Sequence, residues 1–188
     1  MEAILRKEII VTKAGCRVFM VFAFTLLTAL GAFVRIPLPF TPVPITLQTF
    51  FVLLGAALLG SNLGAITQLN YILLGFLGVP LFTGAGSGAA YLLGPTGGYL
   101  AGFVLASFFI ARSIKYAQNK IFSVFALLCL GDLILLVCGA VWLKLLFGYT
   151  LTKALLIGLI PFIPGDLLKA ALAASIYLKL KARFKEIL

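Results

Sequence analysis

Two oppositely charged side chains lie three residues apart in a chain that is 63% hydrophobic. They are Asp166 and Lys169, and Pro164-Gly165 before them is typical of a helix start. Residues three apart share one face of a helix, and a carboxylate in the first turn is stabilised by the positive end of the helix dipole. Ionisable groups within a membrane usually face a cavity or a partner. We expect this pair to accept from and donate to a polar ligand; the alternative is a structural ion pair at the helix start.

A third ionisable residue, Asp132, lies near the middle of another apolar segment. It is a candidate for the floor of a ligand site or for a hydrogen bond between helices, and Asn70 has the same two interpretations. Gly131-Asp132 and Gly165-Asp166 also resemble the two carboxylates of an aspartyl protease. At ~1.5 Å per residue the two aspartates differ by roughly 10 Å in depth, too far to share a proton. No catalytic residue is therefore predicted, and the chain is not expected to be an enzyme.

Two uncharged loops have the composition of a close-fitting ligand site. The first, residues 37–49, is dense in proline, and the second, residues 83–88, is rich in glycine. The glycine-rich loop lacks the lysine of a GxxxxGK[ST] phosphate loop, and no such motif occurs elsewhere in the chain, so ATP hydrolysis by that mechanism is excluded. We expect the backbone at Gly84 and Gly86 to approach the ligand closely. Nearby aromatic residues suited to the apolar wall of a small-molecule site are Phe40, Phe82, Tyr91 and Tyr99.

The composition indicates a membrane protein. Only 11% of the 188 residues are charged, against about 25% in soluble domains. The net charge of +10 would suggest nucleic acid binding in a soluble protein. Here the cations flank apolar segments, which indicates membrane orientation instead, and no nucleic acid partner is expected. With three cysteines and no histidine, the chain is expected to hold no metal and no cofactor.

We expect an all-α integral membrane protein, with six transmembrane helices in one domain over residues 1–188. Apolar segments that could cross the bilayer are 17–35, 46–60, 62–78, 95–112, 121–147 and 163–180. Pro161 and Pro164 interrupt the apolar run after the fifth segment, so residues 150–160 are predicted as a separate short helix on the outer side. Residues 1–16 are predicted as a basic cytoplasmic tail or an interfacial helix.

The distribution of basic residues predicts the orientation. Arg35, Lys144 and Lys153 fall on one side of the six predicted spans. The other side holds Arg6, Lys7, Lys13, Arg17, Arg112, Lys115, Lys120, Lys179, Lys181, Arg183 and Lys185. Because cytoplasmic loops carry the excess of Lys and Arg, both termini are predicted to be cytoplasmic. The proline-dense and glycine-rich loops, and with them the ligand site, then lie on the extracellular side.

Small residues recur on two of the predicted spans. Gly94, Gly98, Gly102 and Ala106 are spaced four apart, which favours close packing of helices inside the bundle. The first span has a second stripe, made of Thr25, Thr28, Ala29 and Ala32. For this stripe we consider both internal packing and docking of another membrane protein, and we retain docking as the prediction.

Several motifs together resemble the BioY family, the biotin-capturing S components of energy-coupling factor (ECF) transporters. These motifs are the proline-dense loop, Leu74-Gly-Phe-Leu-Gly-Val-Pro-Leu-Phe82, the glycine-rich loop and Gly94-Pro-Thr-Gly-Gly-Tyr-Leu-Ala-Gly102. The similarity runs from about residue 20 to 180. Asp166 and Lys169 are similar to the family's acidic–basic pair in the last helix. Thr25 and Thr28 depart from the alanine-rich first-helix stripe of the family.

The resemblance implies a six-helix, multi-pass protein of the bacterial cell membrane that binds biotin. It also implies assembly with a transmembrane coupling subunit and two ATPase subunits, which alone would use ATP. Asp166 would accept from the ureido N–H groups of biotin, and Lys169 would donate to the ureido oxygen or to the carboxylate. Thr46, Gln48 and Asn70 would complete the polar set around a ring covered by the four aromatic residues.

A stand-alone secondary transporter for a small carboxylate-bearing vitamin is the alternative function. Such proteins usually show two similar halves. In this chain only Pro39-Phe-Thr-Pro42 and Pro161-Phe-Ile-Pro164 resemble each other.

Overall fold

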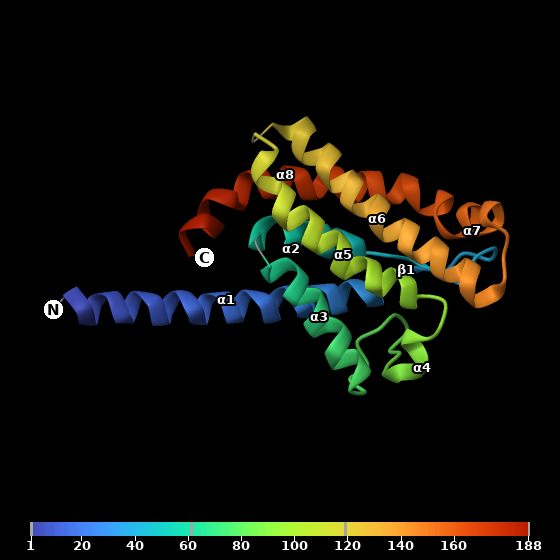
Figure 1. Ribbon diagram of the computed structural model, residues 1–188, viewed down its shortest axis with the longest axis horizontal. Helices are drawn as coiled ribbons and strands as arrows, with labels where there is room; N and C mark the ends of the chain where they lie inside the picture. The colour runs from blue at the N-terminus through green and yellow to red at the C-terminus, as the bar shows by residue number, and fades with distance from the viewer. Residues whose placement is uncertain (1, 61, 119, 188) are drawn as a thin grey trace.

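The computed structural model describes residues 2–60, 62–118 and 120–187, with side chains from residue 13 to 186. The chain is mostly helical (Figure 1). Its elements are α1 (Glu2–Phe33), β1 (Arg35–Ile36), β2 (Ile45–Thr46), α2 (Gln48–Leu59), α3 (Leu63–Phe76), α4 (Gly88–Leu92), α5 (Gly97–Ser113), η1 (Ile114–Tyr116), α6 (Ile121–Phe147), α7 (Leu151–Gly158), η2 (Ile160–Phe162) and α8 (Ile163–Ile187).

Four segments are long and apolar enough to cross a membrane. They are Lys13–Phe33, Gly97–Tyr116, Ile121–Phe147 and Leu151–Glu186. The predicted spans 46–60 and 62–78 correspond to α2 and α3, which have only 12 and 14 residues. At ~1.5 Å per residue these helices reach roughly 18 and 21 Å, less than the ~30 Å hydrocarbon core. The extended backbone of β2 and the turn at Gly60 limit α2, and α3 ends at Phe76.

The proline-rich break before the last long helix lies where the sequence predicts it. α7 ends at Gly158, η2 contains Pro161, and α8 begins at Ile163. The segment predicted as a basic tail or an interfacial helix, residues 1–16, is helical where it is described. The described part of this segment is continuous with the first span, because α1 runs without a break from Glu2 to Phe33 (Figure 1).

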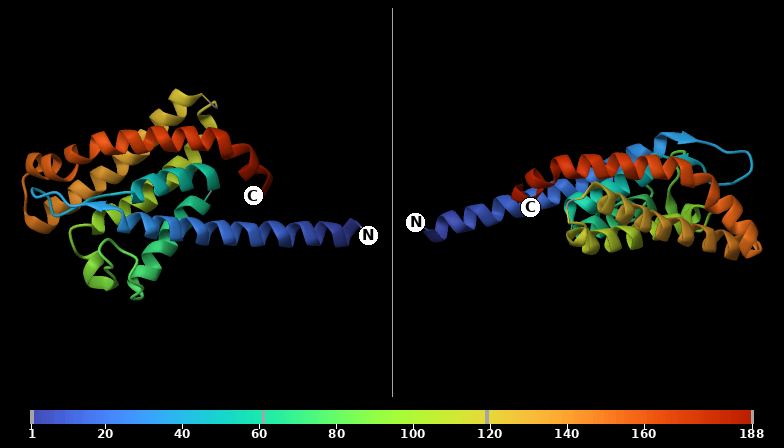
Figure 2. Two further views of the ribbon diagram at one scale, coloured as in Figure 1. Left: turned by 180° about the vertical axis from the view of Figure 1, so that it is seen from behind. Right: turned by 90° about the horizontal axis from the view of Figure 1, so that it is seen from above.

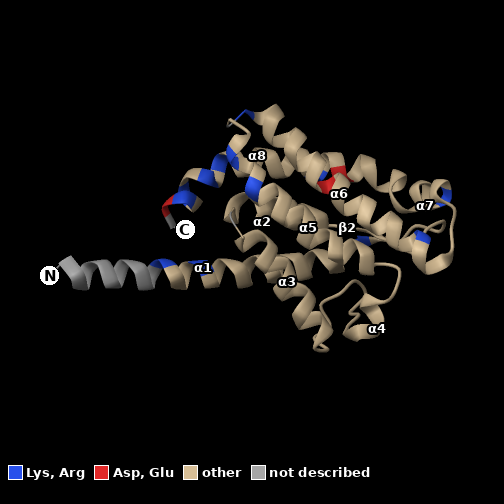
Figure 3. Cartoon of the chain, in the orientation of Figure 1, with Lys and Arg blue, Asp and Glu red and all other residues tan. Residues whose placement is uncertain are grey.

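The proline-dense and glycine-rich loops lie at the opposite end of the molecule from the termini. The β1–β2 hairpin, α4 and α7 lie at one end, whereas both termini and the α5–α6 connection lie at the other (Figures 1 and 2). Most Lys and Arg residues also gather at the end with the termini (Figure 3). This is the unequal distribution of Lys and Arg between the two ends that the sequence predicts.

Small residues allow α5 and α6 to pack closely. A Cβ atom added at Gly102 would lie 2.9 Å from the Cα atom of Leu135 on α6. Ala106, one turn further along α5, is fully buried. The interpretation of this stripe as a packing surface within the bundle is therefore confirmed.

The docking prediction for the first span is contradicted. Thr25, Thr28, Ala29 and Ala32 are all buried inside the bundle. The hydroxyl of Thr25 donates to the carbonyl of Val21 and lies within hydrogen-bonding distance of the Thr67 carbonyl on α3, at 2.9 and 3.2 Å. Small residues suit a buried helix contact as well as a partner contact, and here they face α2 and α3.

Candidate functional site

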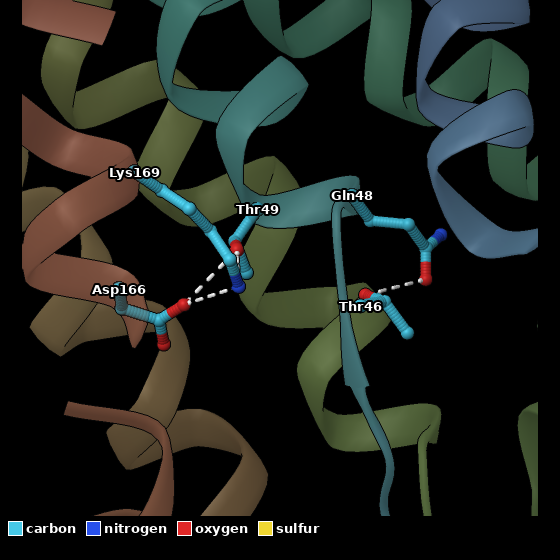
Figure 4. Close-up of polar contacts among 5 residues, drawn as sticks. All are labelled: Thr46, Gln48, Thr49, Asp166 and Lys169. Atoms are coloured by element: carbon cyan, nitrogen blue, oxygen red, sulfur yellow. Dashed lines mark hydrogen bonds and ion pairs between the residues drawn. The ribbon is translucent and has the colours of Figure 1, made fainter. Parts of the chain in front are cut away.

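A buried cluster of three polar side chains joins α8 to the start of α2 (Figure 4). The Nζ atom of Lys169 lies 2.7 Å from Oδ1 of Asp166 and donates to the hydroxyl of Thr49 at 2.9 Å. That hydroxyl donates in turn to Oδ1 of Asp166 at 3.1 Å. The side chains of Asp166 and Lys169 are only 3% and 12% exposed. The second carboxylate oxygen of Asp166, Oδ2, is buried and has no hydrogen-bond partner among the described residues.

The starts of α8 and α2 present these three groups to one another. Asp166 lies in the first turn of α8, and Lys169 follows one turn later on the same face. Thr49 lies in the first turn of α2, whose start is held against the end of α1 because the backbone N–H of Leu47 donates to the carbonyls of Gly31 and Val34. A Cβ atom at position 31 would lie 2.9 Å from the backbone nitrogen of Gln48, so a glycine permits this approach.

A second polar cluster is centred on the amide of Gln48. Its nitrogen donates to the hydroxyl of Tyr71 at 2.7 Å, and this hydroxyl donates to the carbonyl of Leu81 at 3.1 Å. Its oxygen accepts from Thr83 at 3.1 Å and from Thr46 at 3.3 Å, the latter contact being visible in Figure 4. The cluster therefore ties α2 and α3 to the loop that follows α3.

Aromatic rings line the space beside these clusters. Phe82 stacks on Tyr91 with ring centroids 4.8 Å apart and meets Tyr71 edge-on at 5.5 Å. The hydroxyl of Tyr91 donates to the carbonyl of Thr83 at 3.2 Å. On the other side, the hydroxyl of Tyr99 donates to the carbonyl of Gly158 at 2.6 Å, which fixes its ring beside α7.

The two clusters and the aromatic rings surround one cavity of about 50 Å³. It has room for a few water molecules, so a larger ligand requires the walls to move apart. The polar lining consists of Thr46, Gln48, Thr49, Tyr71, Thr83, Tyr91, Thr96, Tyr99, Asp166 and Lys169. The apolar lining consists of Val43, Pro44, Phe82, Leu100, Phe103, Leu135, Leu136 and Phe162. Aromatic and aliphatic side chains combined with polar groups that point into one cavity are typical of small-molecule sites.

The structure brings most of the predicted site residues to this cavity and leaves four outside. Asp166, Lys169, Thr46, Gln48, Phe82, Tyr91 and Tyr99 line it. Asn70 instead donates its amide to the hydroxyl of Thr25 at 3.2 Å, between α3 and α1. Phe40 is 58% exposed in the hairpin loop. Gly86 packs on the ring of Tyr91, and Gly84, at φ 77°, lies beside the guanidinium of Arg35.

Sequence reasoning missed Thr49, Tyr71, Thr83 and Thr96 as lining residues. Thr49 directly follows Gln48 at the start of α2. Its polar side chain next to a predicted site residue was the signal that could have identified it. Tyr71 directly follows Asn70, and the two residues point in different directions around α3. The composition of α3 gave no means of choosing between them.

Asp132 does not line the cavity. It is 6% exposed, and its Oδ1 atom has no hydrogen-bond partner among the described residues. With Asp166 it lines a separate, mostly apolar groove of about 440 Å³ between α6 and α8. In the described part of the chain, no three His, Cys, Asp or Glu residues are grouped so as to hold a metal ion.

Residues 7–186 match the model of the BioY family. The chain belongs to the BioY family. Members of this family are S components of transporters and not enzymes. Together with the apolar helices, membership is consistent with a multi-pass protein of a bacterial membrane.

Relatives match this BioY-family chain over most of their length. A probable biotin transporter BioY from Pyrococcus horikoshii is 39% identical over 162 residues, which are 85% of this chain and 92% of the relative. The biotin transporter BioY from Thermotoga maritima is 39% identical over 158 residues, 84% of this chain and 91% of the relative. A crystal structure of the S component for biotin from an ECF-type ABC transporter superposes with a TM-score of 0.82 at 31% identity. That match covers 90% of this chain and 92% of the solved chain.

Proposed function

We propose that this chain is the high-affinity biotin-binding S component of an ECF-type importer. The observation that carries the proposal is the buried Asp166–Lys169–Thr49 cluster, which faces the same aromatic cavity as the Gln48 amide. Biotin has a ureido group with two N–H donors and one acceptor, an apolar ring and a carboxylate tail. Two separated polar clusters with aromatic rings between them complement such a molecule.

The free carboxylate oxygen of Asp166 suits a ureido N–H group. Oδ1 is already engaged by Lys169 and Thr49, whereas Oδ2 has no partner among the described residues. A buried acceptor without a partner is destabilising by about 1–3 kcal/mol, and a ligand donor that reaches it recovers this free energy. Lys169 then donates to the ureido oxygen or to the carboxylate of the ligand.

In this proposal the chain forms a single domain with six membrane segments, and both termini are cytoplasmic. The four long helices cross the bilayer, and the shorter α2 and α3 complete the six with the help of the hairpin and loop that extend them. The excess of Lys and Arg at the end with the termini supports this orientation (Figure 3). The cavity then opens toward the extracellular side, where biotin is captured.

Import would require a transmembrane coupling subunit and two ATPase subunits, because this chain has no phosphate-binding motif of its own. The likeness to the S component of an ECF-type ABC transporter supports these partners. Uptake of biotin into proteoliposomes that contain this chain alone, driven by an ion gradient, would instead support a stand-alone secondary transporter.

Binding of biotin and its derivatives to the purified chain tests the proposal. We expect calorimetry in detergent to give saturable binding of biotin and none of lipoic acid, which shares the carboxylate tail but lacks the ureido group. Equal binding of the two vitamins would contradict the assignment. Biotin methyl ester, compared on the wild type and on Lys169→Gln, then identifies the end that Lys169 holds. If Lys169 binds the carboxylate, esterification weakens binding to the wild type and has little further effect in the variant.

A further inference from the structure

A basic groove lies at the opposite end of the molecule from the cavity, between α8, α1 and the α2–α3 turn. It has a volume of about 810 Å³, within the range of roughly 300–1,000 Å³ that is typical of small-molecule sites. None of its lining residues lines the cavity that contains Asp166 and Lys169. The proposed biotin site therefore does not account for it.

The floor of this groove is apolar. Leu58 and Leu59 at the end of α2 are buried, and Leu63, Ile114 and Phe184 pack against the same core cluster. These side chains come from the end of α2, the start of α3, η1 and α8. A ligand that occupies the groove thus meets hydrocarbon on its inner side.

The polar lining of the groove is strongly cationic. It includes Arg17 from α1, Lys115 from η1, and Lys181 and Lys185 from α8. No Asp or Glu is among the described residues that line it. The end of the molecule on which it lies is the one where Lys and Arg gather in Figure 3. The groove thus combines a positive rim with an apolar floor.

We propose that this groove binds an anionic phospholipid of the cytoplasmic leaflet. The phosphate lies among Lys115, Lys181 and Lys185, and an acyl chain lies along the floor. The charge and the apolar surface of the groove match the two parts of such a lipid, and basic pockets between helices on the cytoplasmic side are suited to anionic headgroups. The inference rests on the orientation proposed above, in which the termini are cytoplasmic.

Lipid retention by the full-length purified chain tests the inference without using biotin. Native mass spectrometry would measure the binding of phosphatidylglycerol and, separately, of phosphatidylethanolamine. We expect the anionic lipid to bind in preference, and the double variant Lys115→Gln/Lys181→Gln to weaken it. If each lysine contributes about fivefold to the lipid affinity, the double variant should bind the anionic lipid roughly 25-fold more weakly. Biotin binding to this variant remains unchanged, which separates failure of this inference from failure of the proposed function.

The matched control is Lys120→Gln/Lys179→Gln. It removes the same charge from two exposed lysines at the same end that do not line the groove. We expect this control to retain the lipid as the wild type does. Equal losses in both double variants, equal retention of the two lipids, or equally tight binding of glycerol phosphate would each overturn the proposal. It would also be overturned if the groove variant kept its lipid and lost assembly with a coupling subunit, because the groove would then be a protein-docking surface.

Discussion

The ammonium group of Lys169 lies 2.7 Å from Oδ1 of Asp166, whereas Oδ2 of the same carboxylate has no partner among the described residues. If the ion pair only held the start of α8, the fold would be more stable with a hydrogen-bond donor at each of the two carboxylate oxygens. One engaged and one free oxygen, beside a cavity, is the arrangement expected of a pair that awaits a donor from a ligand.

Replacing both members of this pair separates its structural role from its binding role. Asp166→Asn or Lys169→Ala alone leaves a buried group without its partner and should lower the free energy of unfolding by about 3–5 kcal/mol. The double variant Asp166→Leu/Lys169→Met should recover most of that stability, because an apolar pair of similar volume needs no partner. Biotin binding should be lost in all three. A stable double variant that still bound biotin in calorimetry would show that the pair is structural.

Removing the hydroxyl of Tyr71 should loosen the loop that closes the cavity. This hydroxyl accepts from Gln48 and donates to the carbonyl of Leu81, so Tyr71→Phe leaves both groups without their partner. We expect biotin affinity to fall by about 1–3 kcal/mol, or roughly five- to 150-fold. Tyr116→Phe, on an exposed ring, is the control and should bind as the wild type does. Unchanged affinity in Tyr71→Phe would mean that the network does not position the site.

Two phenylalanines that look equivalent in the sequence should behave differently. Phe82 is fully buried and lines the cavity, whereas Phe40 is 58% exposed. Phe82→Ala should lower stability by about 3–5 kcal/mol and strongly weaken biotin binding. Phe40→Ala should change the melting temperature little and leave the binding isotherm intact. A large loss of affinity in Phe40→Ala would mean that the hairpin closes over bound ligand.

A methyl group at Gly102 should separate α5 from α6. The added Cβ atom would lie 2.9 Å from both the Cα and the carbonyl oxygen of Leu135, and the neighbouring helix would have to shift. We expect Gly102→Ala to destabilise the chain by about 1–3 kcal/mol in thermal unfolding in detergent. Gly15→Ala, where nothing lies within 4 Å of the added atom, should not destabilise it. Similar melting temperatures for the two variants would contradict the close packing of these helices.

Asp132→Asn should leave biotin binding nearly intact. Asp132 lines the groove between α6 and α8 and is not among the residues that line the cavity. Its burial next to apolar side chains is costly for a carboxylate, so loss of the charge should not lower the melting temperature. Calorimetry and thermal unfolding measure the two effects. A more than tenfold loss of affinity would assign Asp132 to the binding site.

Hydropathy and residue spacing predicted the parts of this structure that depend on local sequence. The long apolar runs are helices, Pro161 marks the break before α8, and the three-residue spacing of Asp166 and Lys169 places them side by side. The rotation of each helix about its axis was not predictable, because helices that are apolar all round have no polar face to fix it. For this reason residue types alone favour Asn70 at the cavity, which Tyr71 lines instead, and do not show that the Thr25 stripe faces inward.

No local sequence pattern predicts the contacts that Thr49 makes. Its partners Asp166 and Lys169 are 117 and 120 residues further along the chain. The short polar side chain at the start of α2 gives no sign of them, since threonine is common at such positions. Only the packing of α2 against α8 brings the three together.

The separation in sequence between Thr49 and the Asp166–Lys169 pair determines at what stage of synthesis the ligand site can form. While the ribosome is still adding the final segment, α2 and the aromatic rings can already be inserted, yet the ion pair does not exist. A product truncated before residue 166 would keep the stacked rings and the Gln48 network and lack both charges. In the proposed function, vitamin capture therefore begins only once the residues up to Lys169 have been added.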